Sequence, residues 1–95
     1  MEKKVTLKVP GGKLLKVTAD IDNGVLASVQ ITGDFFVYPE EELYHLEQLL
    51  RFHPLDRDLL LYMIQSYLTQ NNVQFYGITP EALTDALMQC SSQDA

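Results

Sequence analysis

Apolar and polar residues alternate along two stretches that flank a turn signal at Asn23-Gly24. The alternating apolar residues are Leu15, Val17, Ala19, Ile21, Val25, Ala27, Val29 and Ile31. A period of two residues is typical of a strand with one buried face. The pattern therefore predicts an antiparallel hairpin with strands over about residues 13–21 and 25–33, and the rest of the chain is organised around it.

The length of the hairpin loop decides the register of the two strands. A two-residue turn would pair Ile21 with Leu26 and set apolar residues opposite polar ones, because a one-residue slip inverts a face. A three-residue loop over residues 22–24 instead pairs Leu15 with Ile31 and keeps all the apolar residues on one face. The glycine at its last position suits the left-handed residue that closes such a loop. We therefore expect the three-residue loop.

A third strand precedes this hairpin. Val5, Leu7 and Val9 alternate with polar residues, which predicts a strand over about residues 4–9 that ends at Pro10-Gly11-Gly12. Three strands with one apolar face are not stable alone in water, so another layer must cover that face.

Helices downstream of the strands can supply this cover. Pro39 before a run of glutamates, Asp56 before a leucine-rich segment, and Thr79-Pro80-Glu81 are all helix-start signals. Apolar residues then recur at helical spacing in each segment. The predicted helices cover about residues 39–51, 56–70 and 79–90. The sequence thus predicts one α+β domain over residues 1–95, with a three-stranded antiparallel sheet and about three helices on one face.

Charge is unevenly spread along the chain, whose net charge is −6. Residues 1–16 hold all five lysines and one acid, whereas residues 17–95 hold two arginines and twelve acids. Because nucleic-acid binding needs a broad basic surface, we expect no nucleic-acid partner. The lysines either form the solvated face of a strand or meet an anionic ligand or an acidic partner.

Targeting and membrane signals are lacking in the sequence. No apolar run approaches the roughly 18 residues that span a bilayer. An alternating segment, not an export signal, follows the first residues. The lone cysteine, Cys90, cannot form an internal disulfide and fits a reducing compartment. We therefore expect a cytoplasmic protein without a membrane partner.

Residues that could carry chemistry are few and scattered. His45 and His53 have no second histidine or cysteine at metal-ligand spacing, so we expect no metal site. Cys90 falls on an apolar helix stripe, where a packed thiol is expected. Gly11-Gly12-Lys13 lacks the full spacing of a phosphate-binding loop and opens a strand, so we interpret it as a tight turn. These observations disfavour a stand-alone enzyme.

The segment Gly33-Asp34-Phe35-Phe36 is the exception, since it joins a carboxylate to two aromatic rings at the end of a strand. If the alternation continues, Phe35 points to the core and Phe36 away from it. Asp34 either caps the turn through backbone N–H groups or contacts a partner or ligand. An exposed Phe36 would suggest an interface, but the first helix could also cover it.

Three segments of the chain resemble a known family. The segments that carry the resemblance are Lys8-Val9-Pro10-Gly11-Gly12-Lys13-Leu14-Leu15, the Asn23-Gly24 turn, and Ile31-Thr32-Gly33-Asp34-Phe35-Phe36 leading to Pro39-Glu40-Glu41. They are similar to the C-terminal accessory domain of lipoate–protein ligases over about Lys8 to Leu50. The resemblance implies a fold related to the iron–sulfur scaffold and sulfur-acceptor proteins, although this chain has no cysteine at the strand exit.

The resemblance also implies a function as one part of a split enzyme. The motifs of the family's catalytic domain are absent here, and the accessory domain is a separate chain in some organisms. The chain would then act with a catalytic subunit that condenses lipoate and ATP to lipoyl-AMP, with Mg²⁺, and lipoylates a lipoyl domain or glycine-cleavage H protein. By itself this chain is expected to bind no cofactor and to have no catalytic residue.

The two turns at the ends of the strands are our hypothesis for the surface that docks the catalytic subunit. The predicted register brings Lys13 near Gly33, so both turns lie at one end of the sheet. The candidate interface residues are Lys8, Gly11, Gly12, Lys13, Gly33, Asp34, Phe35 and Phe36.

Two other functions stay open at this stage. The chain could be a non-catalytic interaction module that recruits an acidic lipoyl-carrier domain through its basic start. It could also be a degenerate scaffold-like domain that binds a small ligand, in which case that ligand alone should stabilise it.

Overall fold

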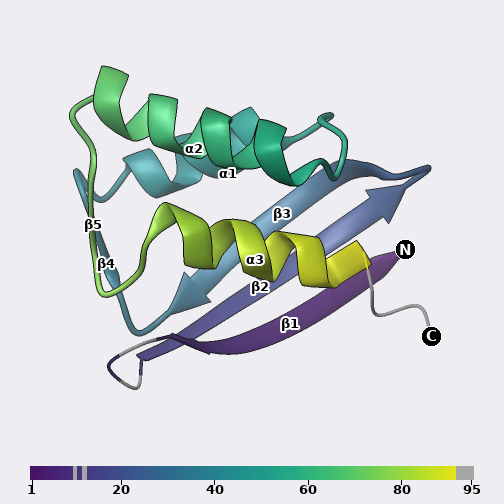
Figure 1. The fold of residues 1–95 in the computed structure, drawn as a ribbon, viewed down its shortest axis with the longest axis horizontal. Helices are drawn as coiled ribbons and strands as arrows, with labels where there is room; N and C mark the ends of the chain where they lie inside the picture. Colours follow the sequence, from purple (N-terminus) through teal and green to yellow (C-terminus); the bar gives the residue numbers. More distant parts are fainter. Residues whose placement is uncertain (10, 12, 92–95) are drawn as a thin grey trace.

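The fold, seen in a computed structural model, is an α+β arrangement of one three-stranded sheet, a short two-stranded ribbon and three helices (Figure 1). The structure describes residues 1–9, 11 and 13–91. The elements in chain order are β1 (Glu2–Val9), β2 (Lys13–Asp22), β3 (Val25–Gly33), β4 (Phe36–Tyr38), α1 (Glu42–Leu50), α2 (Arg57–Gln70), β5 (Gln74–Tyr76) and α3 (Pro80–Ser91). The predicted fold class, with its antiparallel sheet and three helices, is confirmed.

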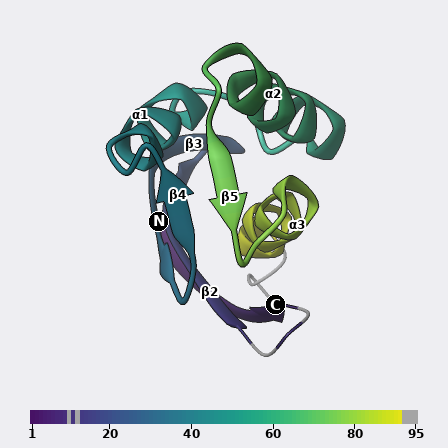
Figure 2. The ribbon, with the colours of Figure 1, turned by 90° about the vertical axis from the view of Figure 1, so that its left-hand side faces the viewer.

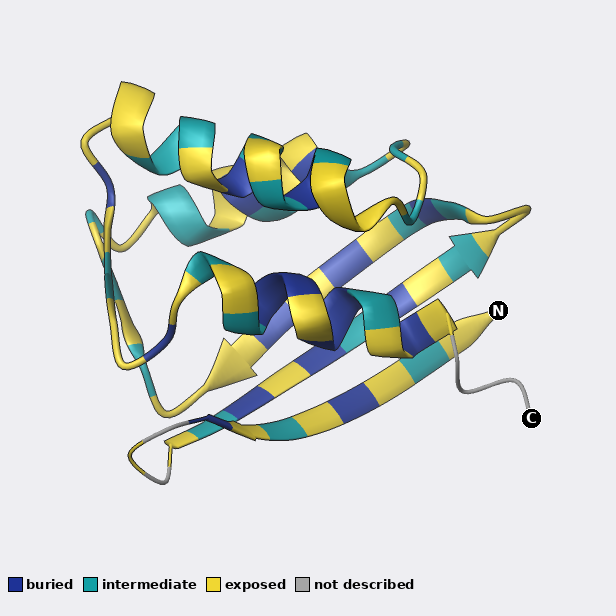
Figure 3. Ribbon diagram, viewed as in Figure 1, coloured by how far each residue is buried: buried dark blue, intermediate teal, exposed yellow. Residues whose placement is uncertain are grey.

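The sheet has the order β1-β2-β3 with both pairs antiparallel, and one of its faces is buried. Helix α1 packs on β3 and α3 packs on β1 and β2, whereas α2 packs on the other two helices (Figures 1 and 2). The opposite face of the sheet carries no helix, and its residues alternate with the buried ones along each strand (Figure 3). The strand periodicity therefore predicted the buried face of the sheet correctly.

The hairpin register differs from our prediction. The turn has two residues, Asn23 and Gly24, both with positive φ, so Ile21 pairs with Leu26. The pairing shifts by one residue between Asp20 and Ile21, and Ala27 is the extra residue of a bulge. The bulge restores the parity that a two-residue turn breaks, so Leu26 on one side of it and Val29 and Ile31 on the other all face the core. The prediction failed because it assumed an uninterrupted ladder.

Beyond the bulge the strands are displaced by two residues from the predicted pairing. Leu15 pairs with Gly33, whereas we expected Ile31 as its partner. A displacement of two residues keeps every side chain on its own face. The core residues beyond the bulge, Val29 and Ile31, were therefore predicted correctly although their partners were not. Before the bulge the prediction was wrong, because Leu26 takes the buried place that we expected for Val25 and Ala27.

Two of the three helices begin directly after the capping residue that the sequence predicted. The Asp56 carboxylate accepts a hydrogen bond from the Leu59 N–H at 3.1 Å, and the Thr79 hydroxyl accepts one from the Ala82 N–H at 3.1 Å. The first helix, however, begins at Glu42 and not at Pro39, because residues 39–41 form a separate turn. Pro39 therefore ends the ribbon instead of opening the helix.

The outer edge of β3 is covered by α1 and the loop after it. A Glu47 carboxylate oxygen accepts a hydrogen bond from the Ile31 N–H at 2.7 Å, and the Arg51 Nε donates to the Ala27 carbonyl at 3.1 Å. The Leu26 N–H donates to the His53 carbonyl at 2.9 Å. These bonds satisfy strand groups that would otherwise remain open to another chain.

Candidate docking surface

The two turns of the docking hypothesis meet at one end of the sheet. Gly33 pairs with Leu15, and the Asp34 N–H donates to the Leu14 carbonyl at 2.9 Å. A shallow cleft of about 470 Å³ lies there, and its lining residues are Gly11, Lys13, Gly33, Asp34, Phe35 and Phe36. The predicted proximity of Lys13 to Gly33 is thus confirmed, although the register behind it was wrong.

Lys8, one of the eight candidate interface residues, is not among the residues that line this cleft. Lys8 is exposed on β1, where it pairs with Leu14 and lies on the face of the sheet that carries no helix. Gly12 lies outside the described residues. Lys8 therefore does not line the cleft, although its pairing partner Leu14 bonds Asp34 there.

Gly33 fixes the path of the chain out of the sheet. Its φ of +150° lies in a region that side-chain-bearing residues rarely adopt, and a Cβ there would stand 2.2 Å from the Leu14 carbonyl oxygen. The close approach of the two backbones requires a glycine. It also aims the following residues, Asp34 to Phe36, across the end of the sheet.

Asp34 presents its carboxylate to solvent. Only its backbone N–H is bonded within the described part of the chain, and its side chain has no hydrogen bond or ion pair there. The structure therefore does not support the interpretation in which this carboxylate caps the turn. A charged acceptor beside Lys13 remains available to a partner.

The two phenylalanines point in opposite directions, as the alternation predicted. Phe35 is half-buried against the core, whereas the Phe36 side chain is 77% exposed. The alternative in which the first helix covers Phe36 is therefore wrong. Phe36 opens β4, so its ring belongs to the two-stranded ribbon and not to the helical layer.

The ribbon carries an exposed aromatic face that the sequence reasoning missed. Strand β4 pairs antiparallel with β5, and Figure 2 looks at the end of the molecule that they form. Phe36, Tyr38 and Tyr76 are 77%, 67% and 51% exposed. Val37 and Phe75, which alternate with them, are partly buried. We call the exposed set, Phe36, Tyr38 and Tyr76, the aromatic ribbon face.

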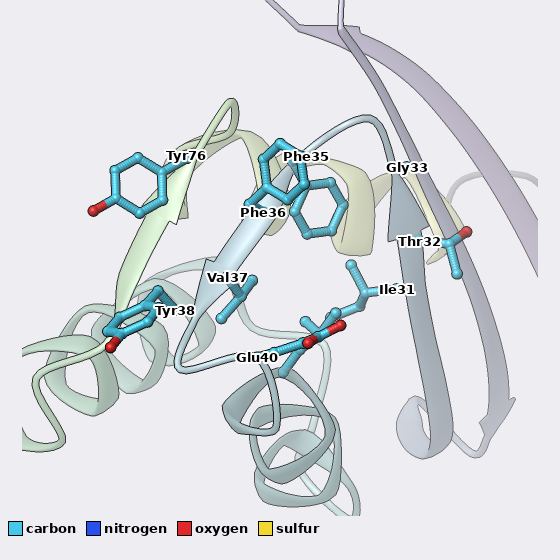
Figure 4. Close-up of a pocket in the computed structure, with 10 residues that line it drawn as sticks. Ile31, Thr32, Gly33, Phe35, Phe36, Val37, Tyr38, Glu40 and Tyr76 are labelled. Atoms are coloured by element: carbon cyan, nitrogen blue, oxygen red, sulfur yellow. The ribbon is translucent and has the colours of Figure 1, made fainter.

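A groove of about 650 Å³ lies between this ribbon and the end of β3. Val37 and Ile31 face each other across it, and Tyr38 and Tyr76 lie on the outer side of the ribbon (Figure 4). Glu40 contributes a carboxylate at its rim. Since exposed contiguous aromatic surface marks interaction sites, the groove and the aromatic ribbon face together form a candidate docking surface.

Groups that could do chemistry lie apart from this surface. The Cys90 thiol is fully buried, and burial raises its pKa. His45 lies near Glu42, with 3.4 Å between Nδ1 and the carboxylate, and His53 has Nδ1 2.9 Å from the Arg51 carbonyl. Among residues 1–9, 11 and 13–91, no three His, Cys, Asp or Glu side chains are grouped to hold a metal. None of the helices in these ranges is long and apolar enough to cross a membrane.

Glu42 and Tyr67 form a hydrogen-bonded pair in which the pKa of each group is shifted from its ordinary value. The Tyr67 hydroxyl donates to the Glu42 carboxylate, which ties α2 to the first turn of α1. Burial, together with this hydrogen bond, raises the pKa of Tyr67 to about 12, and the bond lowers the pKa of Glu42. The pair joins two helices and lines neither the cleft nor the groove, so we assign it a structural role.

Comparison with known proteins places this fold in a family. Residues 1–87 match the model of the bacterial lipoate protein ligase C-terminus. The chain is 31% identical over 74 residues to lipoate-protein ligase A subunit 2 of Thermoplasma acidophilum, covering 78% of this chain and 76% of that protein. It also superposes on a chain of a solved archaeal lipoylation system, a bipartite lipoate protein ligase and its E2 lipoyl domain from the same organism. The TM-score is 0.79 at 30% identity, over 92% of this chain and 94% of that chain. The chain therefore belongs to the family of the bacterial lipoate protein ligase C-terminus.

Proposed function

We propose that this chain is the accessory subunit of a two-chain lipoate–protein ligase. In this proposal a separate catalytic subunit binds ATP, Mg²⁺ and lipoate in the cytoplasm and forms lipoyl-AMP only when the accessory subunit is docked. The lipoyl group then passes to a lipoyl domain or to a glycine-cleavage H protein. The observation that carries the proposal is the similarity to a ligase subunit 2 across most of both chains.

The chemistry of activation explains why a non-catalytic subunit could be required. Adenylation brings together two anions, a carboxylate and ATP, and the reaction centre must be closed to water. A small domain that docks beside the site can order the loops that close over the adenylate. This role needs a rigid docking surface and no catalytic group of its own.

The candidate docking surface has the properties that this role requires. The aromatic ribbon face supplies apolar anchors, and tyrosine and phenylalanine are enriched at the centres of interfaces. Lys13 and Asp34 lie in the neighbouring cleft as exposed charges of opposite sign, which suits the polar rim of an interface. Gly33 holds the two regions in a fixed relation, because its backbone lies against Leu14.

Pyrophosphate release tests the proposal. The candidate catalytic subunit is incubated with lipoate and ATP, with and without this chain and without any acceptor protein. Release that requires both chains supports the activation role. Release by the catalytic subunit alone at the full rate would overturn it.

Variants of the docking surface then test where the two chains meet. Lys13→Glu, Asp34→Lys and Phe36→Ser should weaken complex formation and activation without unfolding this chain. Tyr62→Ser on α2 is the matched control, because Tyr62 is 67% exposed and lies outside the groove and the cleft. Normal activation by all three variants would show that the catalytic subunit docks elsewhere.

A further inference from the structure

The face of the sheet that carries no helix has a basic half. Lys4 and Lys8 are exposed on β1 on either side of Thr6, and Thr6 pairs with Lys16 of β2. Lys16 is therefore the diagonal neighbour of both other lysines, within reach of a single group bound between them. We call Lys4, Lys8 and Lys16 the basic sheet patch.

The side chains of these lysines are not neutralised within the described part of the chain, where none of the three side chains has an ion pair or hydrogen bond. The two arginines lie in other places: Arg57 pairs with Asp85, and Arg51 bonds to Gln48 and Ala27. Three neighbouring like charges repel one another, so an isolated domain gains no stability from this arrangement. A binding partner that supplies negative charge would relieve the repulsion.

The opposite half of the same face is acidic. Glu2 pairs with Asp20, and the Asp20 carboxylate accepts a hydrogen bond from the N-terminal amino group at 2.7 Å. Because the amino group offsets the charge of Asp20, the face changes along its strands from three lysines to one carboxylate in excess, that of Glu2. Such a gradient orients a charged partner as well as attracting it.

We infer that the basic sheet patch docks an acidic protein domain, namely the acceptor that receives the lipoyl group. This inference rests on the proposed function, and it adds a second interface to the docking surface. The basic sheet patch is polar throughout, and interfaces of this kind form fast, weak and salt-dependent complexes. A substrate domain that must leave after each turnover needs such a complex, whereas a permanent subunit suits the aromatic ribbon face.

The position of the basic sheet patch also fits an acceptor domain. Lys8 pairs with Leu14, and the Leu14 carbonyl holds the Asp34 N–H of the docking cleft. A domain bound on the patch would therefore lie beside a catalytic subunit bound at the cleft and the groove. Nucleic acid is a poorer match, because the net charge is −6 and the neighbouring side chains, Thr6, Thr18 and Gln30, offer no rings for base stacking.

The test measures the two half-reactions separately in the two-chain complex. The variant is Lys4→Gln/Lys16→Gln, in which Lys8 is unchanged because it adjoins the docking cleft. Lys4→Arg/Lys16→Arg keeps the charge at both positions, and Thr69→Glu/Gln70→Glu on α2 changes the net charge by the same amount away from the sheet. The probe is a lipoyl domain with an acidic surface, titrated at low and at high salt.

The inference predicts that the glutamine variant raises the KM for the lipoyl domain about fivefold at low salt, as expected for two exposed ion pairs. It should weaken the salt dependence of transfer and leave acceptor-free pyrophosphate release unchanged. The arginine variant and the α2 variant should keep the KM of the unmodified complex.

An unchanged KM and salt dependence in the glutamine variant would overturn the inference while leaving the proposed function intact. Loss of acceptor-free pyrophosphate release in a folded glutamine variant would also overturn it, since the patch would then dock the catalytic subunit. An equal rise in KM in the α2 variant would attribute the effect to net charge and reject the patch. Failure of the proposed function is seen separately, as pyrophosphate release that does not need this chain.

Discussion

Replacing Gly33 by alanine should damage both the stability of the chain and its docking surface. The added methyl group would stand 2.2 Å from the Leu14 carbonyl oxygen, which is backbone and cannot swing aside. The φ of +150° adds strain of about 1–3 kcal/mol for a residue with a side chain. Relief of the clash requires the loss of the Asp34 to Leu14 hydrogen bond, at about 1 kcal/mol. We therefore expect a destabilisation of about 2–4 kcal/mol.

Urea unfolding measures this loss against a matched glycine. With a slope of about 1.5 kcal/mol per molar urea, the midpoint of Gly33→Ala should fall by about 2 M. Gly24→Ala is the control, because Gly24 also has a positive φ, +76°, but an added Cβ meets nothing within 4 Å. Its cost is backbone strain alone, about 1 kcal/mol.

The comparison can refute the reasoning directly. If Gly33→Ala were no more destabilising than Gly24→Ala, the contact with the Leu14 carbonyl would not constrain the chain. In that case the fixed relation between the cleft and the ribbon would also lose its basis. Binding of the catalytic subunit to a Gly33→Ala protein that is still folded at low temperature should be weakened, because Phe36 would be displaced.

Three further predictions concern other parts of the molecule. Phe36→Ala should weaken binding of the catalytic subunit by about 1–3 kcal/mol and change the free energy of unfolding by less than about 0.5 kcal/mol, as calorimetry and urea unfolding can check, with Tyr62→Ala changing neither. Glu47→Gln keeps an acceptor for the Ile31 N–H. Because burial raises the pKa of Glu47, the unmodified chain should lose stability relative to this variant as the pH rises through the range in which carboxyl groups ionise. Equal pH profiles of the urea midpoint in the two proteins would contradict this. The pKa of Tyr67 is raised from 10.0 to about 12, so its contribution to stability should be complete below pH 10 and be lost as the pH rises from 10.0 to about 12. A Tyr67→Phe chain should lack this alkaline loss of stability in thermal melts. An identical loss in the variant would show that Tyr67 is not its cause.

The large elements were predictable because each carries its own local signal. The alternation of β1 to β3 and the caps at Asp56 and Thr79 act within a few residues, so sequence alone places them well. The bulge at Ala27 was not predictable from alternation, because it depends on bonds from Arg51 and the loop that follows α1. Only the folded molecule brings those groups to the strand.

The ribbon was missed for a related reason. Strands β4 and β5 have three residues each, which is too short for a periodic signal, and they pair across two intervening helices. No strand was therefore predicted in the segment after α2, and Tyr38 and Tyr76 were not recognised as neighbours of Phe36. The cleft was predictable because β2 and β3 are consecutive and bring their ends together by themselves.

The ribbon of β4 and β5 is expected to be less stable locally than the three-stranded sheet. Val37 and Phe75 pair across the whole of α1 and α2, so formation of the ribbon closes a long loop of chain. Closing such a loop lowers the entropy of the chain before any contact of the ribbon forms, and a ladder of only three residue pairs offsets little of that loss. We expect the ribbon amides to exchange with solvent deuterium earlier than those of β2, through local opening that leaves the sheet intact. Binding of a second chain at the ribbon would slow that exchange, so deuterium uptake there would report assembly residue by residue.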